Sequence, residues 1–481
     1  MACPTRYHAY SITPMTAAYE TYNTRYVWLI CAVAALGGLL FGYDWVVIGG
    51  AKPFYESFFR LDSVKLIGWA NSCALVGCLI GSVAAGSLSE RWGRKKLLIL
   101  AAFLFAVSSV LTGWSSTFTW FVTWRILGGV AIGMASNVSP MYIAEVSPAR
   151  WRGRLVSLNQ LAIVVGILLA QIVNWRIAET VPDGVSAELL RQSWNVQFGW
   201  RWMFCAVAVP ALVFFAGAWL VPESPRWLVK NGRRAVARPI LARIGGEAYS
   251  QQALEEIEST LRNESVLRVS WRELLTPRLR KIVGIGVVLA VLQQWSGINV
   301  IFNYAEEIYR GAGYGVSGVL FNIVITGTIN LLFTFIALGF VDRFGRRVLM
   351  LAGAGGIAVS HTLLGLAYHL GLKGLPVLLL TLATIGCYAM SLAPITWVLI
   401  SEIFPNRIRG LAVSISVSAL WVACFLLTFT FPLLNAALGP SGTFWLYGAI
   451  CIAGFLFIRA FVPETKGKTL ERIERDLVGL G

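Results

Sequence analysis

Two ionisable residues, Asp44 and Arg125, stand inside long apolar runs of the sequence. A charge at membrane depth is costly, so ionisable residues in such runs usually have a function. Burial raises the pKa of a carboxyl group, and a neighbouring guanidinium lowers it. A motion that changes the distance between the two side chains would therefore change the affinity of Asp44 for a proton. We expect a proton-binding pair; the alternative is a static ion pair that only fixes helix packing.

Amide and aromatic side chains form a second group in other apolar runs. Amides both donate and accept hydrogen bonds, and aromatic rings cover apolar faces, so together they suit a ring of hydroxyl groups. The spacing of Gln293, Gln294 and Asn299 lets them share a helix face around Gly297. The candidate binding residues are Gln160, Gln293, Gln294, Asn299, Asn303, Asn330, Trp397 and Trp421. A single membrane amide serves as often to join helices, and a lone Trp such as Trp421 more often packs.

Composition predicts the elements that must position these side chains. Of the 481 residues, 57% are hydrophobic and 13% are charged, whereas a soluble domain has about 25% charged residues. Because about 20 apolar residues cross a bilayer, the runs predict an all-α membrane protein with twelve spanning helices. The expected spans are 26–49, 66–87, 97–114, 119–143, 155–177, 202–221, 281–306, 315–340, 348–369, 375–400, 411–436 and 442–462.

The spans divide the chain into five parts. We expect a tail at 1–25, a six-helix bundle at 26–221, a linker at 222–280, a second six-helix bundle at 281–462 and a tail at 463–481. Most Lys and Arg residues fall on one side of this topology, which predicts that both termini and the linker are cytoplasmic. The linker is expected to contain short amphipathic helices.

Several classes of function are disfavoured. The net charge of +16 sits in short clusters between apolar runs, which argues against nucleic acid as a partner. The eight cysteines form no CxxC, so neither a metal site nor a disulfide framework is indicated. No nucleotide-binding loop, HExxH motif or other catalytic cluster occurs, so we expect neither an enzyme nor a cofactor.

Three charged motifs occur twice, in the same order, which indicates duplication of a six-span unit. ERWGRK (90–95) matches DRFGRR (342–347), EVSPARWRG (145–153) matches EIFPNRIRG (402–410), and PE recurs at 222–223 and 463–464. A positive-inside rule explains the arginines but not the acidic residues that match between the copies. We expect a cytoplasmic latch of ion pairs. Its candidate members are Glu90, Arg91, Arg94, Glu145, Arg152, Glu223, Asp342, Arg343, Arg346, Glu402, Arg409 and Glu464.

At this point the sequence resembles the sugar porter family of the major facilitator superfamily, and in particular its bacterial proton-coupled xylose and pentose–hexose symporters. The matching stretches include GGLLFGYD (37–44), RWGRKK (91–96), SPMYIAE (139–145), PESPRWL (222–228), QQWSGINV (293–300), PITWVLISEIFP (394–405) and PETKG (463–467).

The resemblance implies two helix bundles that rock about a sugar site near the bilayer midplane. It also implies a functional monomer in a membrane and a sugar of the xylose, arabinose, glucose or galactose class. Asp44 supports proton symport. A bacterial inner membrane suits the compact tails. A passive uniporter is the first alternative, followed by a sugar sensor and a membrane enzyme.

Three residues depart from the pattern of this family. Asn303 stands where many members have Tyr, and Leu420 and Cys424 stand where many have polar side chains. The pocket is therefore expected to be less polar on the side of the eleventh span, which favours a substrate with fewer hydroxyls or a different ring pose.

Overall fold

The computed structural model describes residues 22–182, 186–266, 274, 276–405 and 408–466. These residues form helices and no strands. The first half of the chain contains α1 (Thr24–Phe59), α2 (Val64–Trp92), α3 (Arg94–Gly113), α4 (Phe118–Val146), α5 (Arg152–Ile177), the short α6 (Ala187–Gln192), a π-helix (Asn195–Gly199), α7 (Trp200–Cys205) and α8 (Ala208–Leu220).

The helix α1 is longer than the sequence predicts, because it continues to Phe59 instead of ending near residue 49. The expected end was wrong because Lys52 and Glu56 interrupt the apolar run. Both residues nevertheless lie inside the protein, where they pair with each other at 3.0 Å. Buried charges are tolerated when they are paired, so the helix continues through them.

The second half is formed by α11 (Pro277–Trp295), α12 (Ile298–Asn303), α13 (Ala305–Gly311), α14 (Val316–Phe344), α15 (Arg346–His369), α16 (Leu375–Met390), α17 (Leu392–Glu402) and α18 (Arg409–Phe461). Two expected spans are broken inside the membrane, at Gly297 and at Ser391. The break at Ser391 lies just before Pro394, whose ring disturbs the preceding helical turn.

The 53 residues of α18 would reach about 80 Å at about 1.5 Å per residue, far more than one crossing requires. Gly439 has a non-helical backbone and separates the stretches expected as the last two spans. Of the described helices, eleven are long and apolar enough to cross a membrane. With α18 long enough for two crossings, the fold is consistent with twelve spans.

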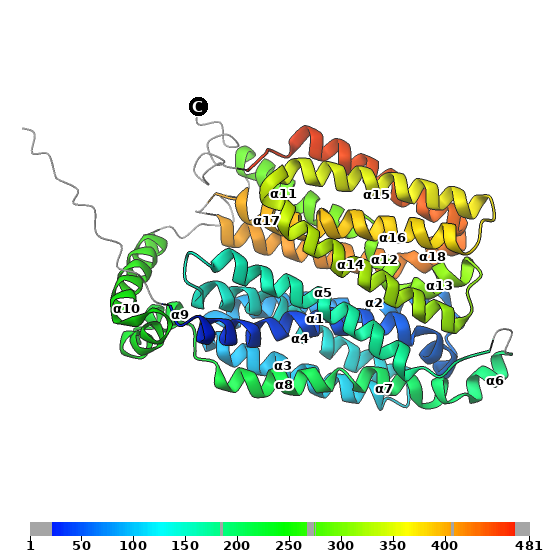
Figure 1. Ribbon diagram of the computed structural model, residues 1–481, viewed down its shortest axis with the longest axis horizontal. Helices are drawn as coiled ribbons and strands as arrows, with labels where there is room; N and C mark the ends of the chain where they lie inside the picture. The colour runs from blue at the N-terminus through cyan, green and yellow to red at the C-terminus, as the bar shows by residue number, and fades with distance from the viewer. Residues whose placement is uncertain (1–21, 183–185, 267–273, 275, 406–407, 467–481) are drawn as a thin grey trace, which may run out of the picture.

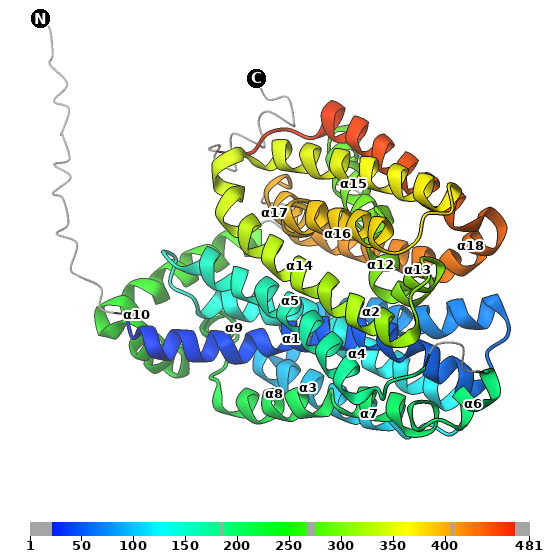
Figure 2. The same cartoon turned by 45° about the vertical axis from the view of Figure 1, so that its right-hand side comes forward.

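The helices of the two halves lie in two groups, one blue to green and one green to red (Figure 1). The linker helices α9 (Pro225–Lys230) and α10 (Arg234–Val266, kinked at Gly245 and Gly246) lie at one end, beside the start of α1. We call this the linker end. A turned view keeps α6 and α13 at the opposite end (Figure 2). Large apolar side chains face outward along the helices, for example Trp114 and Leu220, as expected for a multi-pass membrane protein.

Candidate functional site

Asp44 and Arg125 form a direct ion pair between α1 and α4. Arg125 Nη1 lies 3.0 Å from Asp44 Oδ1, and each side chain is at most 5% exposed. Asp44 Oδ2 and Arg125 Nε have no hydrogen-bond partner among the described residues. The Arg125 guanidinium also lies 5.3 Å from the centre of the Phe204 ring. The sequence-predicted pair is therefore assembled, buried and only partly satisfied.

The three amides of the seventh span form a hydrogen-bonded chain. Gln293 Nε2 donates to the carbonyl oxygens of Leu392 and Ala393, each at 3.3 Å. Gln294 Nε2 donates to Gln293 Oε1 at 3.2 Å. Asn299 Nδ2 then donates to Gln294 Oε1 and contacts Cys424 Sγ at 3.3 Å. The structure thus brings together three candidate amides and one of the three residues that depart from the family pattern.

The break between α11 and α12 makes this chain of amides possible. Gly297 has φ of +83°, a left-handed conformation that glycine adopts at no steric cost. A Cβ built at this position would lie 3.0 Å from His361 Nε2. Asn299 on α12 can therefore reach back to Gln294 on α11, although a continuous helix would not place them in line.

The remaining candidates surround this chain to different extents. Gln160 on α5 is half-buried and Asn330 on α14 is buried, and these two helices pack against each other. Asn303 is buried, and its Oδ1 has no hydrogen-bond partner among the described residues. Trp397 is 38% exposed.

Trp421 packs across the two halves of the chain. Its ring lies 5.9 Å from that of Phe41 and 6.3 Å from that of Trp45, both on α1. The side chain is 3% exposed, and its Nε1 has no partner among the described residues. This arrangement serves packing and also leaves a buried donor for a ligand.

Sequence reasoning missed a further amide, Gln171. Its side chain is 1% exposed, and neither Oε1 nor Nε2 has a described hydrogen-bond partner. It lies against Gly327 of α14, in the other half of the chain. The signal was present in the sequence, because Gln171 follows Gln160 by three helical turns and so shares its face.

Charged residues at the linker end form one network in each half. Arg94 Nη2 lies 2.9 Å from Glu145 and 3.0 Å from Glu90. Glu223 accepts the backbone N–H groups of Arg94 and Lys95, at 2.9 and 3.1 Å. A carboxylate in this position stabilises the start of α3, because it balances the positive end of the helix dipole.

The second half repeats this arrangement. Glu464 accepts the backbone N–H groups of Arg346 and Arg347, at 2.9 and 3.1 Å, at the start of α15. Arg346 Nη2 lies 3.6 Å from Glu402. The PE motifs thus have the same role in both copies.

The other latch candidates have different surroundings. Arg409 donates to the Phe404 carbonyl, and Arg91, Arg152 and Arg343 are exposed. The side chain of Asp342 lies outside those that the structure describes. Of the ion pairs that join two described residues at the linker end, those of Arg94 lie in the first half and that of Arg346 in the second, and the others involve the linker helices. The latch between the halves stays a prediction.

At the opposite end, ion pairs join the two halves of the chain. Lys52 of α1 pairs with Glu306 at 3.4 Å and also with Glu307, both on α13. Sequence reasoning missed this contact, because Lys52 and Glu306 are 254 residues apart.

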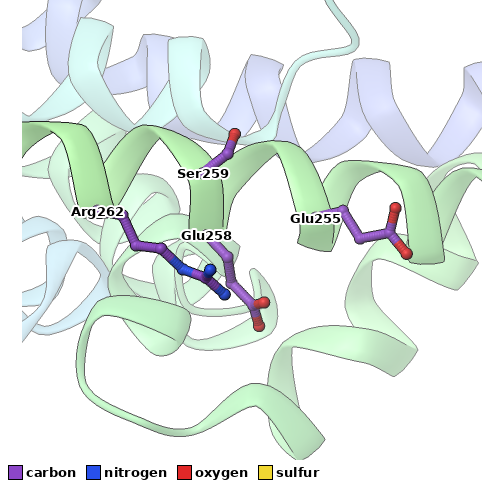
Figure 3. A pocket seen from close by; sticks show the side chains of 4 residues that line it. All are labelled: Glu255, Glu258, Ser259 and Arg262. Atoms are coloured by element: carbon purple, nitrogen blue, oxygen red, sulfur yellow. The ribbon is translucent and has the colours of Figure 1, made fainter.

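A shallow surface pocket lies elsewhere, on the linker helix α10 (Figure 3). It is lined by Glu255, Glu258, Ser259 and Arg262 of that single helix, and so involves none of the candidate binding residues.

This fold, with a buried ion pair and a chain of amides in broken helices, defines a secondary transporter of the major facilitator class. The sequence profile of a family described as "Sugar (and other) transporter" matches residues 30–477. The D-xylose-proton symporter of Escherichia coli K12 is 40% identical over 94% of this chain and 96% of its own length. The glucose transport protein of Synechocystis is 43% identical over 94% of this chain and 98% of its own length.

Solved structures agree. A partially occluded inward-open conformation of the xylose transporter XylE from E. coli has a TM-score of 0.82 at 38% identity, covering 92% of this chain and 100% of that one. XylE bound to 6-bromo-6-deoxy-D-glucose has a TM-score of 0.79 at 39% identity, covering 95% and 100%. The chain belongs to the sugar transporter family, the sugar porters of the major facilitator superfamily.

Proposed function

We propose that this chain imports a monosaccharide together with a proton by alternating access. The observation that carries the coupling is the buried pair of Asp44 and Arg125, in which Asp44 Oδ2 has no described partner. A proton can bind that oxygen when a rocking motion moves the guanidinium away. Relatives named as proton symporters for D-xylose in E. coli and for arabinose in Bacillus subtilis support the proposal.

The proposed sugar site centres on Gln293, Gln294 and Asn299, with Gln160, Asn330, Trp397, Trp421 and Asn303 around them. The substrate is proposed to be of the xylose, arabinose, glucose or galactose class. The weak acceptor Cys424 Sγ faces Asn299, which supports a less polar wall on this side. We propose that the linker end is cytoplasmic, that the membrane is a bacterial inner membrane, and that the monomer is functional.

The charged networks of the linker end are proposed to act as the inner latch. The ion pairs that join described residues of each network lie within one half. When the linker end closes, Arg and Glu side chains of the two networks approach each other, and ion pairs between halves then compete with those within them.

A passive uniporter is the second candidate. The ion pair is direct, and the Arg125 guanidinium is also held over Phe204. Both contacts favour a static pair that only fixes helix packing.

Uptake into proteoliposomes distinguishes these two candidates. We expect one of labelled xylose, arabinose, glucose and galactose to accumulate when an inward proton gradient is applied, and a protonophore to abolish the accumulation. A membrane potential of 100 mV is worth about 2.3 kcal/mol per charge, which permits about fortyfold accumulation.

The variant Asp44→Asn tests the residue assignment. We expect it to lose accumulation and to retain sugar exchange, because Asn cannot bind and release the proton. The exposed Asp62→Asn is the matched control and should accumulate sugar like the parent chain. Accumulation that survives in Asp44→Asn would refute the assignment, and equilibration that ignores the gradient in the parent chain would make it a uniporter.

A further inference from the structure

Five charged residues gather where α1 meets α13 at the opposite end; we call them the Lys52 cluster. Its members are Lys52, Glu56, Glu306, Glu307 and Arg310. Lys52 contacts all three carboxylates, and Arg310 Nη1 lies 2.7 Å from Glu306 Oε1. α1 belongs to the first half of the chain and α13 to the second, so these ion pairs join the halves.

The backbones are also close at this place. A Cβ built on Gly49, one turn before Lys52, would lie 2.5 Å from the Phe302 carbonyl oxygen. The Lys52 ammonium lies 5.6 Å from the centre of the Tyr304 ring, and Tyr304 donates to the Thr428 carbonyl at 2.7 Å. Lys52 is therefore enclosed by elements of the second half, and separation of the halves at this end would expose it.

The charges of the cluster do not balance. Three carboxylates face two cations, and one of these, Arg310, has a side chain that is 63% exposed, whereas that of Lys52 is 2% exposed. An uncompensated charge is costly in a buried site. A bound proton would remove the excess negative charge.

Glu307 has one carboxylate oxygen that can accept the proton. Glu307 Oε2 is buried and has no described hydrogen-bond partner, although the other carboxylate oxygen pairs with Lys52. Beside the cluster, the Tyr55 hydroxyl is buried and has no hydrogen-bond partner among the described residues. The Glu307 side chain is 28% exposed, which leaves a path for proton exchange.

We propose that the Lys52 cluster is a second proton-binding site, which locks the two halves together at the opposite end when Glu307 is protonated. The proton neutralises the charge that is in excess while Lys52 stays paired with Glu56 and Glu306. The site is separate from Asp44, and the proposal does not require that Asp44 couples transport.

The electrostatics of α13, which lies beyond the spanning stretch Leu279–Asn303, support this division of roles. Burial, helped by Glu306 and Glu56 and opposed by Lys52, raises the pKa of Glu307 to about 7. Burial acts in the same sense on Glu306, but Lys52 and Arg310 outweigh it and lower the pKa of Glu306. Tyr55 and Tyr304 are the other titratable groups beside the cluster.

The sign of the pH effect follows from these shifts. Opening exposes Glu307 to water, where a Glu has a pKa of about 4.3, so the joined state binds the proton more tightly. The joined state therefore gains stability as pH falls through about 7 and loses it as pH rises. Between pH 8 and pH 6, the ratio of joined to open molecules should rise about tenfold.

The experiment measures the separation of the halves in nanodiscs, where both faces have the same pH. Spin labels at the exposed positions Lys65 and Lys373, introduced as Lys65→Cys and Lys373→Cys after replacement of the native cysteines, report distance distributions at pH 6 and pH 8. The background carries Asp44→Asn, so titration of Asp44 cannot contribute. We expect the short-distance population to increase at pH 6.

Variants distinguish a proton-binding site from a set of ion pairs that only joins the halves. Glu307→Gln should hold the short-distance population at its low-pH level at both pH values. Lys52→Met should favour the open state at pH 8 and move the midpoint of the response to higher pH. Glu255→Gln, on α10, should respond like the parent. A pH response that persists in Glu307→Gln, or none in the parent, would overturn the proposal.

Discussion

At the scale of single residues, the amide chain of the seventh span joins sequence pattern to chemistry most directly. Gln294 and Asn299 were expected to share a face of one helix, whereas the structure joins them by a hydrogen bond across the break at Gly297. Asn299 contributes one donor group that serves two acceptors, Gln294 Oε1 and Cys424 Sγ. A sugar hydroxyl that replaces either acceptor would bind at this point.

Asn299→Ala should weaken sugar binding. Loss of one buried amide costs about 1–2 kcal/mol, which corresponds to a rise in KM of about tenfold. The measurement is the concentration dependence of sugar exchange in proteoliposomes. The matched control is Asn137→Ala, which removes a 2.8 Å hydrogen bond to Ser82 between α2 and α4 and should leave KM unchanged. Equal KM values in both variants would exclude Asn299 from the sugar site.

At the scale of elements, two breaks inside helices position the amide side chains. Gly297 separates α11 from α12 and turns the chain so that amides on both sides meet. Ser391 separates α16 from α17. The carbonyl oxygens of the two residues that follow this break, Leu392 and Ala393, accept hydrogen bonds from Gln293. Broken helices with free backbone groups are found in transporters where a substrate binds.

Gly297→Ala should therefore destabilise the protein. A side chain in a left-handed conformation costs about 1–3 kcal/mol, and the new Cβ would also crowd His361. Gly284→Ala is the control, because Gly284 lies within α11 with open space around it. In detergent, we expect Gly297→Ala to lower Tm and Gly284→Ala to leave it unchanged or raise it slightly. An unchanged Tm for Gly297→Ala would show that the break does not depend on this glycine.

The limits of prediction from sequence also appear at this scale. Apolar runs and duplicated motifs were sufficient for the helical fold and for the buried pair of Asp44 and Arg125, because each signal is local or repeated. The end of α1 was wrong because the partners of Lys52 are remote in the chain, and a single sequence does not reveal them. Gln171 was missed, although it shares a helix face with Gln160, because a single amide in an apolar run serves as often to join helices.

At the scale of the whole molecule, a glutamate just after the last helix of each half binds the start of another helix in the same half. Glu223, just after α8, binds the start of α3, and Glu464, just after α18, binds the start of α15. The linker helices are not needed for either contact. We therefore expect each half to keep its own charged network during any movement of the halves relative to each other.

The chain should consequently tolerate a cut in the linker. Fragments 1–266 and 267–481, expressed together, should restore sugar exchange, whereas neither fragment should do so alone. A cut after residue 205 separates Glu223 from α3 and should abolish exchange, so it serves as the control. Loss of exchange after the first cut, with both fragments present in the membrane, would show that the linker must be continuous.

The amide chain also affects the step in which the transporter returns without sugar. In this structure the side chains of Gln293, Gln294 and Asn299 are hydrogen-bonded, and part of that bonding is to one another. Hydrogen-bonded amides cost less to keep away from water than unpaired ones. We therefore expect these hydrogen bonds to lower the barrier to reorientation of the carrier without sugar. Net uptake would depend on that step, whereas exchange of one sugar for another would not. The hydrogen bonds that a sugar would displace from the three amides are thus the same ones that would help the carrier to reorient without sugar.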